Sequence, residues 1–86
     1  MTRRNTLAEL AGEDALFADG YDDAIIGVCT VDGTTRILYD REAVLRVLVE
    51  RDGMDLDGAL EFFEFNIEGS YVGKDGPVFA SLVGPA

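Results

Sequence analysis

The sequence predicts an α+β fold, in which a small antiparallel sheet, made of a β-hairpin and a C-terminal strand, packs against two or three helices. Three observations support this prediction. A β-branched apolar run at residues 24–31 is followed by Asp32-Gly33, a dipeptide typical of two-residue hairpin turns. Two segments with helical apolar spacing come next, and a second strand-like run, residues 77–83, follows them. We expect residues 1–86 to form a single domain, with flexible ends at about 1–5 and 84–86.

The first half of the chain supplies a short helix and the hairpin. Thr6-Leu7-Ala8-Glu9 has the form of a capping box, so a helix should begin there, and residues 13–18 could add a further turn. Residues 24–31 are apolar on both faces, which indicates a strand covered on both sides. Residues 34–39 should return as the second strand. Cys29 lies in the first strand, and we expect its thiol to be buried and structural.

The second half of the chain supplies two helices and the last strand. Asp40 is a suitable N-cap for the first of these helices, and Gly53 is a suitable left-handed C-cap. Asp55 should cap the next helix, which ends at Gly69-Ser70. The apolar stripe of this helix recurs at i, i+3, i+4, i+7 and i+11, and it is formed by Leu56, Ala59, Leu60, Phe63 and Ile67.

The aromatic residues of this helix exceed what one core face can accept. Consecutive helical positions lie about 100° apart, so Phe62, Phe63 and Phe65 cannot all point in the same direction. Phe63 belongs to the apolar stripe. Phe62 or Phe65 must therefore cover a second surface, either the preceding helix or a partner chain.

The charge and composition restrict the classes of function. The formal net charge is −10, with no His and one Cys. This charge opposes direct binding to nucleic acid or to an anionic membrane and favours basic partners or cations. Without His, the usual nucleophile–base pairs and the usual zinc sites are excluded. No apolar run approaches the roughly 20 residues of a membrane span, so we expect a cytoplasmic protein without a cofactor.

One segment resembles a calcium loop in part. In residues 53–64, Asp55, Asp57, Gly58 and Glu64 occupy positions that an EF-hand loop uses. Gly53 stands at position 1, where a carboxylate is required. A helix with an acidic first turn explains the same residues better.

A second acidic group precedes the first strand. Asp22 and Asp23 could hold a divalent metal or act as an acid/base pair, with a third ligand from Glu61 or Glu64. The simpler interpretation is an exposed turn, in which one Asp accepts hydrogen bonds from nearby backbone N–H groups.

Taken together, several short motifs resemble a family of small accessory proteins encoded by tailed bacteriophages. The motifs lie at residues 21–27, 39–40, 52–54, 61–66, 69–73 and 77–79. Gly58 and Gly76 depart from the family pattern, which usually has Glu or a similar residue and Thr at these positions. The resemblance implies a phage accessory protein and brings no catalytic residues with it.

Three functions are consistent with these observations. The leading hypothesis is a non-enzymatic accessory protein that binds a host or phage protein. In a specific form of this hypothesis, the chain is a nucleic-acid mimic that inhibits a basic protein. The alternatives are a small metal-dependent enzyme or cation-binding domain that uses the acidic residues named above, and a self-associating assembly protein, for example a homodimer. The candidate interaction residues are Asp22, Asp23, Glu61, Phe62, Glu64, Phe65 and Tyr71.

Overall fold

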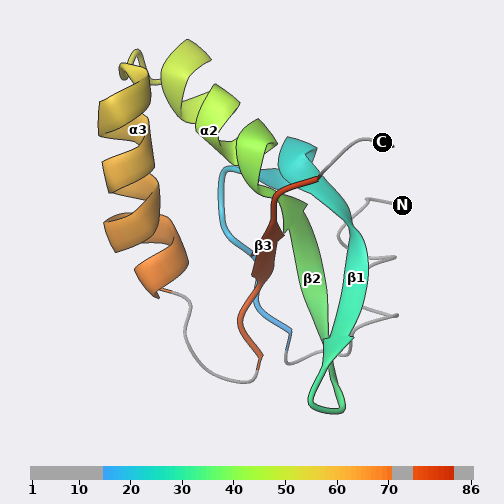
Figure 1. Cartoon of the computed structure of the whole chain (residues 1–86). Helices are drawn as coiled ribbons and strands as arrows, with labels where there is room; N and C mark the ends of the chain where they lie inside the picture. The colour runs from blue at the N-terminus through green and yellow to red at the C-terminus, as the bar shows by residue number, and fades with distance from the viewer. Residues whose placement is uncertain (1–14, 71–74, 83–86) are drawn as a thin grey trace.

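Two helices pack against a three-stranded sheet in the computed structural model, which describes residues 15–70 and 75–82 (Figure 1). The strands β1 (Ile25–Val31), β2 (Thr34–Asp40) and β3 (Val78–Ala80) lie in the order β1-β2-β3. The helices α2 (Arg41–Glu50) and α3 (Leu56–Phe62) follow β2 in the chain. The predicted α+β class is confirmed, with a hairpin, a C-terminal strand and helices. The predicted capping box at Thr6 and both predicted flexible ends lie outside the described residues.

The β1–β2 hairpin follows the predicted turn. Asp32 has a φ of +51° and Gly33 a φ of +80°, so both central residues are left-handed, as a type I′ turn requires. The pairing is antiparallel, and it shifts between Ile25 and Gly27, which leaves Ile26 as the extra residue of a β-bulge. The turn chemistry therefore sets the start of the hairpin register, and the bulge changes this register near the other end.

The third strand corrects the expectation of a purely antiparallel sheet. β3 runs parallel to β2, with Leu38 opposite Val78 and Asp40 opposite Ala80, so the sheet is mixed. The chain passes through both helices between these two strands, and a crossover of this kind brings the chain back in the same direction. β3 is also shorter than predicted, because it ends at Ala80.

Asp40 caps the start of α2 as predicted, whereas the C-cap of this helix is Arg51 and not the predicted Gly53. Asp40 Oδ1 accepts hydrogen bonds from the backbone N–H groups of Glu42 and Ala43, at 3.1 Å and 3.3 Å. Gly53, shortly after the helix, has a φ of +72° and allows the chain to turn toward α3.

The core lies between the sheet and the two helices. The residues buried there include Ile37 and Tyr39 of β2, Leu48 of α2, and Phe63, which directly follows α3. Phe79 of β3 joins the sheet to the helices, because its ring centroid lies 5.2 Å from that of Tyr39 and 5.1 Å from that of Phe63. The second contact is edge-to-face, an arrangement that aromatic pairs prefer.

The segment before β1 is held to the rest of the fold by two backbone hydrogen-bond donors. The Leu16 N–H donates to the Asp75 carbonyl at 3.0 Å, and the Ala18 N–H donates to the Tyr39 hydroxyl at 2.7 Å. Residues 15–18 do not form the helical turn that the sequence suggested. Ala18 is fully buried, so this segment is an integral part of the fold.

Burial differs from expectation at several positions. β1 is not covered on both sides, because only Ile25 among its residues is buried and Cys29 is half-buried. A hairpin commonly packs one face on the core and leaves the other more open. Leu56 was expected in the apolar stripe of α3 but is 60% exposed, since it is the first residue of the helix and the core contact begins at Ala59.

None of the helices within the described ranges has the length and apolarity that a bilayer crossing needs.

Candidate functional site

The helical segment from Leu56 to Ser70 carries most of the predicted interaction residues. α3 continues into η2, a π-helix over Phe63–Ile67, and then into η3, a 3₁₀ turn over Glu68–Ser70. Asp55 caps the segment, because its Oδ1 accepts the Gly58 N–H at 2.7 Å. π-helices are rare and are frequently found at functional sites. The predicted cap is confirmed, whereas the π-helix gave no signal in the sequence.

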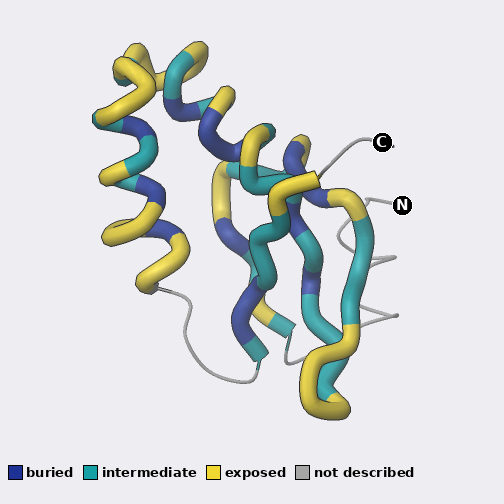
Figure 2. The backbone as a smooth tube through the Cα atoms, in the orientation of Figure 1, coloured by how far each residue is buried: buried dark blue, intermediate teal, exposed yellow. Residues whose placement is uncertain are grey.

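One side of this segment is a row of carboxylates that we call the acidic ridge. Its members recur at intervals of four, three and four residues, so they share one helix face. They are all exposed, and they face away from the side that buries Ala59, Phe63 and Ile67. The acidic ridge consists of Asp57, Glu61, Glu64 and Glu68. Figure 2 shows the outer side of α3 and its continuation as largely exposed.

The acidic ridge has no neutralising cation along its own segment. The sequence contains no Lys or Arg from position 52 to position 70. Among the described residues, the ion pairs join Arg41 to Glu42 and Arg51 to Asp52, and neither pair involves the ridge. The ridge is therefore a continuous source of negative potential on the surface.

An open hollow lies beside the acidic ridge, with a volume of about 440 Å³. It is lined by Gly58, Glu61, Phe62, Phe65 and Asn66. Phe65 is 73% exposed, whereas Phe62 is half-buried and packs against the core. The prediction that the aromatic residues could not share one core face is confirmed, and Phe65 is the residue that the core leaves out. Gly58 has no side chain to fill the hollow.

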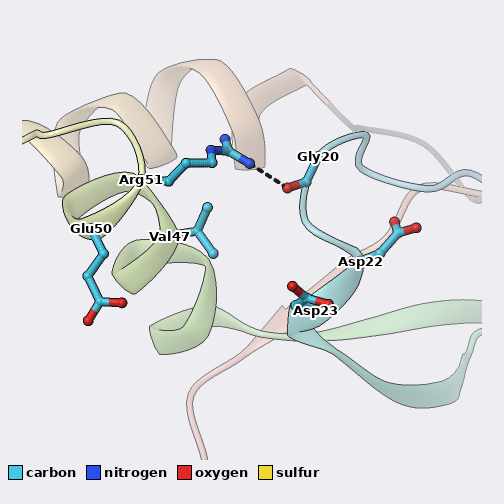
Figure 3. A pocket seen from close by; sticks show the side chains of 6 residues that line it. All are labelled: Gly20, Asp22, Asp23, Val47, Glu50 and Arg51. Carbon is cyan, nitrogen blue, oxygen red and sulfur yellow. Dashed lines mark hydrogen bonds between the residues drawn. The ribbon is translucent and has the colours of Figure 1, made fainter.

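A second hollow of about 430 Å³ lies where the end of α2 meets the 3₁₀ turn η1 (Asp22–Ala24). Figure 3 shows the residues that line it, which are Gly20, Asp22, Asp23, Val47, Glu50 and Arg51. Asp22 and Asp23 thus come from η1, whereas Glu50 is the last residue of α2 and Arg51 is its C-cap.

Arg51 organises one wall of the second hollow. Its Nη1 donates to the Gly20 carbonyl at 2.8 Å, its Nε donates to Asp52 at 2.9 Å, and its guanidinium lies 5.3 Å from the centroid of the Tyr21 ring. The hydrogen bonds with Asp52 raise the pKa of Arg51, and the same bonds lower the pKa of the Asp52 carboxyl. Arg51 therefore fixes the segment before η1 against the end of α2.

The structure separates the two acidic groups that the cation-binding hypothesis combined. Asp22 and Asp23 line the second hollow, whereas Glu61 lines the first. Within the part of the chain that the structure describes, no group of three or more Asp, Glu or Cys residues is placed to hold a metal ion. Tyr71, the remaining candidate, lies outside the described residues.

The chain was compared with protein-family models, curated proteins and solved structures. No match was found. The resemblance to tailed-phage proteins therefore stays a prediction.

The sequence analysis missed the contribution of Gly58 and Asn66 to the first hollow, although positions 58, 61, 62, 65 and 66 have the spacing of one helical stripe.

Proposed function

We propose that this chain is a non-enzymatic accessory protein, of the type encoded by tailed bacteriophages, that acts in the host cytoplasm by binding a basic protein. The acidic ridge is the binding surface. In its specific form the proposal is nucleic-acid mimicry, in which the ridge occupies the phosphate-binding groove of the partner and so inhibits it.

The observation that carries this proposal is the row of exposed carboxylates from Asp57 to Glu68, none of which forms an ion pair with another described residue. With an α-helical rise of about 1.5 Å per residue, spacings of three and four residues place successive ridge residues about 4.5–6 Å apart along the helix axis. One strand of DNA has a phosphate about every 3.4 Å along its axis, so the linear charge densities are of the same order. A groove that binds phosphates with Lys and Arg would therefore meet a comparable row of anions.

Affinity capture from a bacterial lysate at low ionic strength tests the proposal. The wild-type chain should recover a basic nucleic-acid-binding protein. A variant with Glu61→Gln, Glu64→Gln and Glu68→Gln should lose it, because these changes remove the ridge charges and keep the side-chain size. Added DNA should displace the partner, and raised salt should weaken the complex, since the attraction between exposed charges is screened.

A matched variant removes the same amount of charge elsewhere on the surface, through Asp23→Asn, Asp32→Asn and Glu50→Gln. This variant should retain the partner if the position of the charges matters. Equal loss in both variants would show that net charge alone is responsible. Recovery of no basic protein by the wild-type chain would reject the proposal, and a partner that DNA does not displace would reject the mimicry.

A further inference from the structure

We infer that the hollow beside the acidic ridge accepts an arginine side chain of the basic partner. This inference rests on the proposed function, because it identifies the group by which the partner is anchored. The hollow is lined by the aromatic residues Phe62 and Phe65 and by the acidic residue Glu61. A guanidinium group is planar, so it can stack on an aromatic face while its N–H groups donate to a carboxylate.

The lining of the hollow suits this occupant. Phe65 is 73% exposed, which leaves most of its ring accessible, and Gly58 contributes no side chain that would block access. Glu61 belongs to both the hollow and the acidic ridge. A partner that lays its basic residues along the ridge would therefore bring an arginine to the hollow.

Elsewhere in the fold, an aromatic ring and a carboxylate contact the same arginine side chain. The Arg51 guanidinium lies over the Tyr21 ring and donates to the Asp52 carboxylate at 2.9 Å and 3.1 Å. Arg41 likewise lies 5.1 Å from the centroid of the Phe63 ring. In the hollow, the ring and the carboxylate are present, but none of the described arginines lies over Phe65 or pairs with Glu61.

Charge decides which class of occupant the hollow favours. A second copy of this chain would bring a further net charge of −10 against the ridge, and this repulsion opposes a homodimer through the same surface. A basic protein brings the opposite charge. Among basic side chains, arginine fits better than lysine, because the ammonium group of lysine is compact and strongly hydrated.

Two synthetic peptides test the inference: a Gly/Ser peptide that carries several arginines, and the same peptide with lysines in their place. Binding is followed by NMR through the Gly58 amide and the ring protons of Phe65. We expect the arginine peptide to bind about two- to fivefold more tightly than the lysine peptide, and to shift both sets of signals. Phe65→Leu should remove this preference and leave the charge-driven binding.

Two variants serve as matched controls. Leu56→Ala removes another exposed apolar side chain from the same helix, outside the hollow, and should preserve the preference for arginine. Glu64→Gln removes a ridge charge and should weaken both peptides by a similar factor.

The remaining outcomes separate the inference from the proposed function. Equal affinity for the two peptides, with shifts along the ridge but none at Phe65, would overturn the arginine site and leave the ridge as a binding surface. No binding of either peptide would overturn both. Concentration-dependent shifts of Phe65 in the protein alone would assign the hollow to a second copy and reject the arginine.

Discussion

Tyr39 links the sheet to the segment before β1 through a single hydroxyl group. The side chain is fully buried, and its hydroxyl accepts the Ala18 N–H at 2.7 Å. A buried N–H that loses its acceptor costs about 1–3 kcal/mol. We therefore expect Tyr39→Phe to lower the free energy of unfolding by about that amount, as measured by urea denaturation.

Hydrogen exchange provides the control for this substitution. In Tyr39→Phe the Ala18 amide should exchange faster relative to the Ala24 amide, which donates to the Tyr21 carbonyl and not to the lost hydroxyl. A stability that stays within about 0.5 kcal/mol of wild type would mean that water or a local shift satisfies the Ala18 N–H.

For individual residues, the sequence predicts contacts between positions close together in the chain and misses contacts between distant positions. The caps by Asp40 and Asp55 and the turn at Asp32-Gly33 join residues at most three positions apart, so residue type alone indicates them. Ala18 and Tyr39 are 21 positions apart, and no local pattern relates an alanine amide to a distant tyrosine.

Two glycines of the α3–η3 segment should respond differently to substitution by alanine. A Cβ at Gly69 would lie 2.9 Å from the Glu64 carbonyl oxygen, which is backbone, whereas a Cβ at Gly58 would lie 2.9 Å from Oδ1 of the Asp55 side chain. We expect Gly69→Ala to destabilise the fold by about 1–3 kcal/mol, because the helix backbone itself must move. The measurement is the free energy of unfolding in urea.

Gly58→Ala is the matched comparison for this effect. The Asp55 carboxylate can rotate away, which weakens the cap by about 1 kcal/mol. The higher helix propensity of alanine stabilises the helix by a similar amount. The net change should therefore be smaller than that of Gly69→Ala. If both variants were equally stable, the backbone near Glu64 would have to be more adaptable than the close contact indicates.

The elements themselves were predicted better than their arrangement. The hairpin and both helices follow from apolar periodicity and end signals, which act within each element. The direction of β3 depends instead on the route of the chain through α2 and α3, and no residue of β3 specifies it. The π-helix at Phe63–Ile67 escaped prediction because the apolar positions keep their helical spacing through it.

The charge of the whole molecule should control both its stability and its binding. A net charge of −10 on 86 residues produces repulsion within the folded chain. At neutral pH, raising NaCl from about 20 mM to about 200 mM should increase the Tm by several degrees, because screening reduces this repulsion. The same change should weaken a complex with a basic partner.

Repeating the thermal unfolding near the sequence pI of about 4.1 provides the control. The net charge is then small, so the dependence of the Tm on salt should largely disappear. A Tm at neutral pH that falls or stays constant with added NaCl would show that local ion pairs outweigh the general repulsion.

The candidate site was predictable in its residue types and only partly in its geometry. An excess of aromatic residues over core positions indicates from sequence alone that Phe62 or Phe65 must leave the core, and Phe65 does so. Which carboxylates come together depends on the packing of separate elements. This is why Asp22 and Asp23 lie in one hollow and Glu61 in another.

The bulge in β1 also affects how the chain behaves at high concentration. Among the described strands β1 pairs with β2 alone, so the opposite edge of β1 is the one at which pairing between molecules, and hence aggregation, would start. The extra residue Ile26 interrupts the regular row of backbone donors and acceptors along that edge and increases the local twist. An irregularity that slightly weakens the hairpin therefore makes strand-to-strand association between copies less favourable.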